Sequence, residues 1–404
     1  MQNQGNFQTL KVNKPFSLEN GGELPCLEIA YHTFGRLNDK RDNCIWVCHA
    51  LTANSDVADW WPHTVVPEGF LDPEKYFIVC ANILGSCYGS SGPLSTNPET
   101  GEPWYDAFPR ITIRDMVKAH KILADHLELD SIFSLMGSSL GGFQAVEWAL
   151  LEPERFESLV LIATDIYASP WAIAIDETQR MTILADKTYG EKRRDAAKDG
   201  LAAARAIALL TYRGGKGYNL TQQDAPCDTV PDYHRACSYQ RHQGDKLVKR
   251  FDAYSYMAIL DAFDTHNVGR GRNGVQMALS NIKCPTLCVG ITTDLIFTPE
   301  EIRNFTAFIP KAKYKEISSQ FGHDGFLVEH SLLNTIIKDF FSSLPVSPLP
   351  PSKEVEKDTS GSDSLASSES TSGRKSRKAR RSRKLENLED PHPQPPIIPL
   401  PPIP

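Results

Sequence analysis

The stretch that decides the fold is Ser131-Ile132-Phe133-Ser134-Leu135-Met136-Gly137-Ser138-Ser139-Leu140-Gly141-Gly142. Residues 132–136 form an apolar run typical of a buried strand, and helix-forming residues follow from Gly142. Between them, residues 137–141 match the pattern G-x-S-x-G, in which a serine occupies a sharp strand-to-helix turn. A side chain at either glycine position would collide with neighbouring backbone. The stretch therefore predicts Ser139 as a nucleophile, and the competing Ser138 lacks glycines at the corresponding positions.

Strand-like and helix-like patterns alternate on both sides of this turn. The apolar runs suit strands that are covered on both faces of a sheet; they lie at residues 27–31, 45–48, 76–82, 132–136, 158–163, 286–290 and 314–317. Helical spacing occurs at residues 113–127, 142–151 and 332–341. This alternation predicts an α/β fold with a mostly parallel, doubly wound sheet.

A helical segment interrupts the alternation between residues 167 and 280. Helical patterns follow one another there, for example at 195–212 and 254–263. We interpret the segment as an insertion that covers the carboxyl edge of the strands, where ligands bind in open α/β sheets. The predicted organisation is a first core part at 1–166, a helical lid at 167–280 and a second core part at 281–344.

The last 60 residues, 345–404, have a different composition. They hold 12 of the 28 prolines and carry a net charge of +2, which leaves −9 for the first 344 residues of a chain whose net charge is −7. Eight of the eleven residues 374–384 are basic. We expect a disordered tail because it has too little apolar surface to form a core. A solubilising role is favoured over binding to nucleic acid, an acidic surface, a membrane or a polyproline-binding domain, and the tail's partner is unknown.

The acidic body argues against nucleic acid as its main ligand, because phosphate binding needs a cationic surface. No apolar stretch is long enough to span a membrane, and the first residues do not form a secretory signal. The nine cysteines lie mostly inside apolar runs and indicate buried free thiols, without the spacing of a zinc site. We therefore expect a cytoplasmic protein without a metal or a membrane partner.

A histidine and an acid should follow the nucleophile along the chain, each at the end of a strand. Among the downstream histidines, only His323 lies in a glycine-bounded loop, residues 322–325, after a predicted strand. Asp294 follows the strand at 286–290 and is the predicted partner of His323. Asp261 and Asp264 are alternatives, but they lie in helical surroundings.

Two backbone N–H groups should stabilise the oxyanion that forms when the nucleophile attacks a carbonyl. One belongs to the residue after the nucleophile, Leu140. The other comes from the loop after an early strand, and the sequence of residues 48–54 nominates Leu51. We interpret His49, in the same loop, as a structural histidine in preference to a catalytic one.

Five segments then resemble the homoserine O-acetyltransferases of the α/β-hydrolase type, over a span of about residues 16–341. They are His49-Ala50-Leu51-Thr52, Gly89-Ser90-Ser91-Gly92-Pro93, Ile113-Arg114-Asp115-Met116-Val117, Gln144-Ala145-Val146-Glu147-Trp148 and Gly322-His323-Asp324-Gly325-Phe326. The resemblance implies an α/β-hydrolase fold, a Ser139–Asp294–His323 triad and a homodimer formed through the lid. It also implies that Asp324 binds the amino group of the substrate.

The segment 204–213 is similar to the family's lid helix. This implies that Arg205 binds the substrate carboxylate and that Tyr212 makes a second contact, although a solvated helix face is an alternative interpretation. The family's usual residues beside the nucleophile differ from Ser138 and Leu140, and its glycine after His-Ala-Leu-Thr is replaced by Ala53. These departures lie beside the expected acyl pocket.

The implied reaction transfers an acetyl group from acetyl-CoA to the hydroxyl of L-homoserine through an acyl-serine, as a step of methionine biosynthesis. No cofactor is needed, and the partners are the two small-molecule substrates. The alternatives on the same triad are a homoserine O-succinyltransferase, a serine O-acyltransferase and, with less support, a serine esterase.

Overall fold

A twisted sheet lies at the centre of the protein, for which a computed structural model describes residues 5–226, 229–230 and 233–345. Within this part of the chain the sheet has eight strands, in the order β1-β4-β6-β5-β7-β8-β9-β10. They are β1 (Asn6–Val12), β4 (Leu27–Phe34), β5 (Cys44–Cys48), β6 (Phe77–Ala81), β7 (Ser134–Ser138), β8 (Leu159–Ile162), β9 (Thr286–Ile291) and β10 (Ala312–Ile317). Two short strands, β2 (Phe16–Ser17) and β3 (Glu23–Leu24), pair separately.

The predicted mostly parallel sheet is confirmed. Neighbouring strands from β6 to β10 are parallel, whereas β4 is antiparallel to both β1 and β6. Strand β1 was not predicted from the sequence, because most of its side chains are exposed and leave no apolar run. The short strands β2 and β3 were not predicted either, and the other seven strands of the large sheet lie close to their predicted limits.

Helices cover both faces of the sheet, as expected for a doubly wound fold. Strand β5 shows this by alternation: Trp46 belongs to one core cluster, and Ile45 and Val47 belong to the other. The first cluster includes residues of α2 (Ile113–His126), α3 (Leu140–Leu151) and α10 (Pro299–Thr306). The second includes residues of α1 (Val57–Trp60) and α12 (His330–Ser342).

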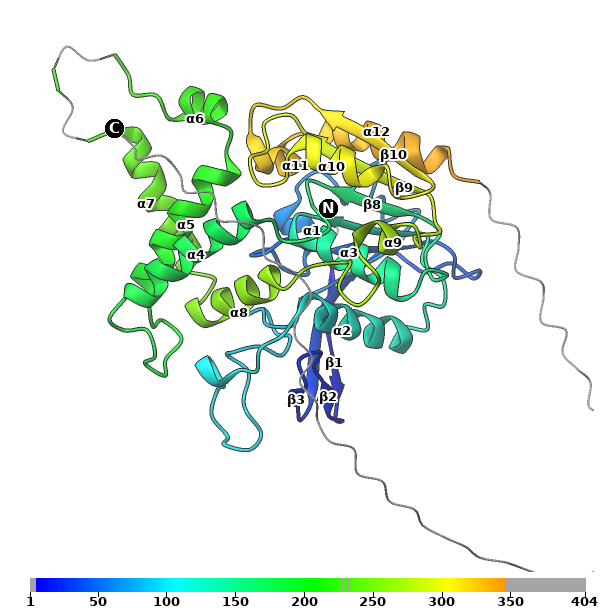
Figure 1. Cartoon of the computed structure of the whole chain (residues 1–404), viewed down its shortest axis with the longest axis horizontal. Coiled ribbons are helices and arrows are strands. Elements are labelled where there is room, and N and C mark those ends of the chain that lie inside the picture. Colours follow the sequence, from blue (N-terminus) through cyan, green and yellow to red (C-terminus); the bar gives the residue numbers. More distant parts are fainter. Residues whose placement is uncertain (1–4, 227–228, 231–232, 346–404) are drawn as a thin grey trace, which may run out of the picture. The chain divides into compact units, whose positions relative to one another are not determined.

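The helical segment predicted between the two core parts is present between β8 and β9. It contains α4 (Pro170–Ala185), α5 (Lys198–Tyr212), α6 (Gly215–Gln222), α7 (Arg235–Val248), α8 (Ala253–Asp264) and α9 (Val275–Leu279). Helix α5 packs against both α4 and α7, and the three form a group to the left of the sheet in Figure 1. The sheet and these helices belong to one compact unit. The limits 167 and 280 stay predictions, and the predicted tail lies outside the described residues from residue 346 onward.

Three short elements complete the described structure: η1 (Tyr105–Ala107), η2 (Gly322–Asp324) and α11 (Gly325–Val328). Eight cysteines of the described chain are free thiols, and five of them are buried, in line with the sequence prediction. The prediction is wrong for Cys237, which is exposed on α7, and Cys227 lies outside the described residues. No described helix has both the length and the apolar character needed to cross a membrane.

Candidate active site

Ser139 lies on the turn between β7 and α3 in a strained backbone conformation. Its φ of 54° and ψ of −130° are rare for a residue with a side chain. Two carbonyl groups hold this turn, because the Ser139 N–H donates to the oxygens of Ile162 and Ala163, both at 3.1 Å. The serine is therefore placed at the carboxyl end of a central strand by the sheet itself.

The glycines of the pattern are required by close backbone contacts. A Cβ atom at Gly137 would lie 2.1 Å from the carbonyl oxygen of Gly141, and one at Gly141 would lie 2.0 Å from that of Cys48. Both distances are far shorter than a carbon–oxygen contact allows. The competing Ser138 is fully buried in β7, and its hydroxyl has no hydrogen-bond partner within the described chain. The geometry thus favours Ser139 over Ser138.

His323 and Asp294, predicted from separate loops, are hydrogen-bonded to each other. The Nδ1 atom of His323 lies 2.7 Å from Oδ2 of Asp294. The other oxygen of Asp294 accepts hydrogen bonds from the N–H groups of Ile296 and Phe297, at 2.9 and 3.1 Å. Because Nδ1 faces the carboxylate, the Nε2 atom of His323 is left to act on a second group. The alternative acids Asp261 and Asp264 instead pair with Arg180.

The environment of His323 favours its protonated form. Burial lowers the pKa of the imidazole, but the charge and hydrogen bond of Asp294 and the charge of Asp324 outweigh burial, so the net pKa is raised. A histidine of this kind can accept a proton from a neighbouring hydroxyl and hold it as an imidazolium.

Ser139 and His323 line one pocket of about 560 Å³, which lies between the sheet and the inserted helices. Of the residues predicted from the sequence, it also holds Leu51, Arg205, Tyr212 and Asp324. The other residues that line it are Ala50, Thr52, Ala53, Asn54, Asp59, Trp60, Pro62, Lys246, Arg250, Phe326 and Leu327. The structure thus brings every predicted site residue to this pocket except Leu140 and Asp294. Leu140 lies in the first turn of α3 behind Ser139, and Asp294 lies behind His323, to which it is hydrogen-bonded.

Two backbone N–H groups beside Ser139 are free to bind a negatively charged oxygen. Within the described part of the chain, neither the N–H of Leu51 nor that of Leu140 donates a hydrogen bond. The side chain of Gln144 links their segments, since its Nε2 donates to the carbonyl oxygens of His49 and Leu140 at 3.2 and 3.1 Å. Gln144 therefore holds the Leu51 loop against the start of α3.

His49 has the structural role expected for it. It is fully buried, its Nδ1 lies 2.8 Å from the carbonyl oxygen of Ala50, and its Nε2 accepts from the N–H of Ile83 at 3.1 Å. Burial lowers the pKa of His49 to about 4, so the ring is neutral. Both ring nitrogens are occupied, and the residue fixes the loop that carries Leu51.

The substrate-binding residues predicted on α5 and after His323 carry complementary charges. In the described structure the guanidinium of Arg205 has no hydrogen bond or ion pair; its Cζ lies 5.5 Å from the centre of the Tyr212 ring. Asp324 pairs with Arg213, whose Nε lies 2.8 Å from Oδ2 of the carboxylate. Burial raises the pKa of Asp324, and the charges of Arg213, Arg205 and His323 act against this shift. A free cation and a buried carboxylate therefore face the same pocket.

A smaller inner pocket of about 20 Å³ adjoins the nucleophile. Leu51, Ser139 and Tyr212 line both pockets. The remaining walls of the inner pocket are Ala172, Ile175, Asp176, Gln179, Phe263, Ile296 and Phe297. Such a volume accommodates about one atom the size of a water oxygen or a methyl group.

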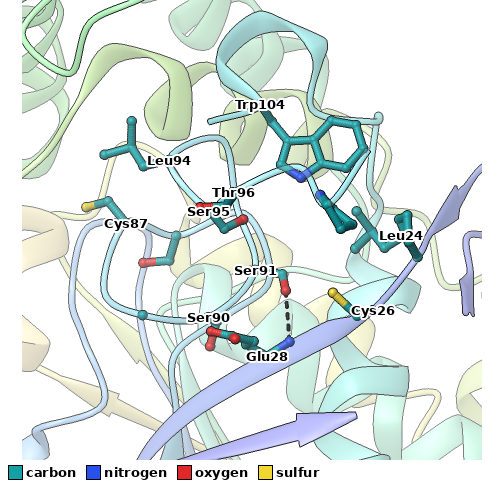
Figure 2. Close-up of a pocket in the computed structure, with 14 residues that line it drawn as sticks. Leu24, Cys26, Glu28, Cys87, Ser90, Ser91, Leu94, Ser95, Thr96 and Trp104 are labelled. Carbon is teal, nitrogen blue, oxygen red and sulfur yellow. Dashed lines mark hydrogen bonds between the residues drawn. The ribbon is translucent and has the colours of Figure 1, made fainter. Parts of the chain in front are cut away.

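A separate cavity of about 330 Å³ lies beside the loop that follows β6. Figure 2 shows Cys26, Glu28, Ser90, Ser91 and Trp104 around it, with the Ser91 hydroxyl accepting a hydrogen bond from the N–H of Glu28. None of the three predicted triad residues lines this cavity. It is therefore distinct from the site at Ser139. No group of three metal-ligating side chains occurs in the described residues.

Several pocket residues were not predicted from the sequence. Lys246 and Arg250 line the outer pocket, and Asp176 lines the inner one. Lys246 and Asp176 lie in unremarkable helical sequence, so no local signal distinguishes them. Gln144 lies in one of the five resembling segments, and that position was the only available indication of its importance.

Known proteins of one family are similar to this chain in sequence and in fold. Residues 44–330 match the sequence pattern of a family described as alpha/beta hydrolase fold. The homoserine O-acetyltransferase of Cyclobacterium marinum is 46% identical over 325 residues, which are 80% of this chain and 92% of that protein. The homoserine O-acetyltransferase of Trichormus variabilis is 40% identical over 82% of this chain and 92% of its own length.

Solved structures show the same fold. The crystal structure of homoserine O-acetyltransferase from Staphylococcus aureus is 28% identical, with a TM-score of 0.70 over 86% of this chain and 98% of that one. Esterase E22 is 21% identical, with a TM-score of 0.76 over 84% of this chain and all of that one. The resemblance stated from the five segments is confirmed: this chain belongs to the homoserine O-acetyltransferase family of the α/β-hydrolase fold.

Proposed function

We propose that the protein transfers an acetyl group from acetyl-CoA to the hydroxyl of L-homoserine. The observation that carries the proposal is the pocket in which Ser139 and His323 meet Arg205 and Asp324. An amino acid presents a carboxylate and an ammonium group, which match the unpaired guanidinium of Arg205 and the carboxylate of Asp324. An acyl acceptor bound in this way would bring its side-chain hydroxyl toward the nucleophile.

In the first half-reaction, Oγ of Ser139 attacks the thioester carbonyl carbon while its proton passes to Nε2 of His323. Asp294 stabilises the imidazolium that forms. The N–H groups of Leu51 and Leu140 bind the oxyanion, and each is expected to lower the barrier by about 2.7–4 kcal/mol. The C–S bond then breaks, and the CoA sulfur leaves with the proton from His323, so an acetyl-Ser139 ester remains.

In the second half-reaction, His323 accepts the proton of the homoserine hydroxyl as that oxygen attacks the acetyl-Ser139 carbonyl. The bond to Oγ of Ser139 breaks, and Oγ takes the proton back from His323. The products are O-acetylhomoserine and free enzyme. No cofactor enters this scheme, and the inserted helices limit the access of water to the acyl-serine.

The inner pocket favours acetyl over succinyl as the transferred group. Its volume of about 20 Å³ suits the methyl of an acetyl group beside Ser139, whereas succinyl adds a methylene and a carboxylate. Among the described residues that line it there is no Lys, Arg or His to match the charge of the succinyl carboxylate. A succinyl donor would therefore need a wider and more basic pocket.

Steady-state kinetics with varied acetyl-CoA and homoserine tests the proposal. Parallel double-reciprocal lines and a mass increase of one acetyl group on Ser139 are the expected results. Succinyl-CoA serves as the competing donor and serine as the competing acyl acceptor. A preference for succinyl-CoA would identify it as the donor in place of acetyl-CoA, and a preference for serine would identify it as the acceptor in place of homoserine. Release of acetate at a rate independent of homoserine would instead identify an esterase. Full turnover by Ser139→Ala would show that Ser139 is not the nucleophile.

The remaining parts of the proposal concern the setting of the reaction. We place it in methionine biosynthesis and in the cytoplasm, whose reducing conditions suit a chain with eight free thiols in its described part. A homodimer through the inserted helices is supported by the exposed apolar side chains of Trp171, Met181 and Leu184 on α4. Light scattering coupled to size-exclusion chromatography would measure the mass, and Met181→Lys should shift it toward the monomer.

A further inference from the structure

The carboxylate of Asp324 is held by an arginine that does not itself line the outer pocket. Nε of Arg213 lies 2.8 Å from Oδ2 of Asp324. Asp324 lines the outer pocket together with Ser139, whereas Arg213 lines a separate cavity of about 10 Å³ next to α6 and α7. Arg213 therefore meets a ligand in the outer pocket only through Asp324.

The contact between the two side chains depends on charge more than on hydrogen-bond direction. Nε of Arg213 is buried and has no aligned acceptor within the described chain, although Oδ2 of Asp324 is close to it. Among the described residues, Arg213 is the one that forms an ion pair with Asp324. A carboxylate has two oxygens that accept several hydrogen bonds, so this pairing leaves Asp324 able to bind a ligand as well.

Arg213 also favours the charged form of Asp324. Burial raises the pKa of this carboxyl group, and the charge of Arg213 is the largest influence against burial, followed by those of Arg205 and His323. The charge of Asp294 acts in the same direction as burial. In the proposed reaction Arg205 binds the ligand carboxylate and His323 must be neutral to accept a proton. Arg213 is therefore the cation that stays with Asp324 throughout.

The main chain fixes the place of Arg213. The end of α5 touches η2 backbone to backbone, because a Cβ atom at Gly322 would lie 2.4 Å from the nitrogen of Gly214. The N–H of Gly217 donates to the carbonyl oxygen of Gln320 at 3.2 Å. The arginine and the carboxylate are thus brought together by two segments that are held against each other.

We propose that Arg213 positions the carboxylate of Asp324 for the ammonium group of the acyl acceptor and thereby makes the enzyme select an amino acid over a hydroxy acid. This inference rests on the proposed function, in which Asp324 meets that ammonium group. An acceptor without the amino group would leave the buried carboxylate without a partner on the side of the pocket, which is costly. Arg213 is a positioning residue, because it acts through Asp324.

The test compares two acyl acceptors, homoserine and γ-hydroxybutyrate, which is homoserine without its amino group. The ratio of their kcat/KM values measures how well the acetylated enzyme recognises the ammonium group, since the proton transfer to His323 that both acceptors need cancels in it. In Arg213→Met this ratio should fall about tenfold, the loss expected when a charge-assisted hydrogen bond is weakened. Acetyl-CoA is the donor throughout, and released CoA is measured.

The pH dependence of the same ratio is a readout that a change in packing alone would not move. Asp324 must be ionised to bind the ammonium group, so the ratio falls as the pH drops through the pKa of Asp324. Arg213→Met removes the charge that opposes burial and raises this pKa further, so the ratio should begin to fall at a higher pH than in wild type. The other charged groups that act on Asp324, which are Arg205, His323 and Asp294, are the same in both proteins.

Arg213→Lys provides the rescue. It keeps a positive charge beside Asp324, and because the contact depends on charge, the ratio should stay within about threefold of wild type. Arg193→Met is the matched control, since Arg193 pairs with Asp195 at 2.6 Å between α4 and α5 and lines neither the outer nor the inner pocket. Melting temperatures show whether each variant is folded.

Three outcomes would overturn the inference. The first is a wild-type ratio in folded Arg213→Met, and the second is an equal loss of kcat/KM for both acceptors, which would place the effect of Arg213 on the loop of His323. The third is an Arg213→Lys variant as impaired as Arg213→Met. All three leave acetyl transfer to homoserine standing, whereas a wild-type chain that acetylates Ser139 but transfers nothing to homoserine would refute the proposed function itself.

Discussion

The contact between His323 and Asp294 makes the pH dependence of the reaction predictable. His323 must be neutral to accept a proton, and Asp294 raises its pKa, so the acid limb of kcat/KM should lie above the ordinary value of 6.5. Asp294→Asn removes the negative charge that offsets the effect of burial on the pKa of His323, so the acid limb of the kcat/KM profile should move to lower pH. The rate should also fall by about 10⁴-fold, as in other triads that lose this carboxylate. A pH profile of both proteins tests this, and an unchanged limb in the variant would contradict it.

Arg205 offers a second test with a single residue. Because its guanidinium has no ion pair within the described chain, Arg205→Gln should fold normally and raise the KM for homoserine by about 10- to 100-fold, the loss of a charge-assisted hydrogen bond. Arg303→Gln is a control on α10, where an exposed arginine pairs with Glu316. The assignment of Arg205 to the substrate carboxylate would not survive a wild-type KM in Arg205→Gln.

The close contact at Gly141 makes a prediction about stability. A Cβ atom there would meet the carbonyl oxygen of Cys48 at 2.0 Å, so Gly141→Ala should destabilise the fold by about 3 kcal/mol, the upper end of overpacking. Gly215→Ala is the matched control, since its Cβ would meet nothing within 4 Å. Chemical unfolding measures the stability of both variants, and equal values would show that the turn at Ser139 can relax around the added methyl group.

At the scale of elements, helix α3 is fixed on two sides. Gln144 ties its first turn to the Leu51 loop, and Glu147 accepts from Arg114 of α2 at 2.8 Å and from Arg272 at 3.0 Å. These contacts give a structural role to two of the three resembling segments that contain no predicted catalytic residue, residues 113–117 and 144–148. They brace the helix that begins behind the nucleophile.

Gln144→Leu tests this bracing. The substitution keeps the volume but leaves the carbonyl oxygens of His49 and Leu140 without their donor, so a loss of about 2–3 kcal/mol in stability is expected. A shift of the oxyanion donors by about 1 Å would lower kcat by up to ~100-fold. Gln276→Leu on the exposed side of α9 is the control. An unchanged kcat in Gln144→Leu would mean that the two N–H groups are held by other contacts.

Most elements could be predicted from the sequence because buried strands and amphipathic helices leave periodic patterns. Strand β1 could not, since its exposed side chains carry no such pattern. The triad could be predicted because glycines and strand ends mark its loops. Asp176 and Lys246 could not: they lie inside α4 and α7, and only the packing of those helices brings them to the two pockets.

At the scale of the whole molecule, the residues that line the outer pocket lie between Ala50 and Leu327. Removal of residues 346–404 should therefore leave kcat/KM within about twofold and the melting temperature nearly unchanged, since the composition of this segment offers too little apolar surface to add to a core. Kinetics of the full and shortened chains test this. A large loss of activity in the shortened chain would show that the tail takes part in catalysis. RNA binding that weakens with salt and occurs only with the full chain would indicate that the basic residues at 374–384 bind RNA.

The site draws on two parts of the chain with separate duties. Ser139, His323 and Asp294 stand on loops of the sheet, whereas Ala172, Asp176, Arg205 and Tyr212 stand on helices inserted between β8 and β9. Substitutions in the inserted helices can therefore change which acyl acceptor binds without altering the residues that activate Ser139. A mutant library confined to α5, which carries Arg205 and Tyr212, would explore new acyl acceptors while the acetyl pocket lined by α4 stays unchanged, which makes α5 the place to redesign acceptor specificity.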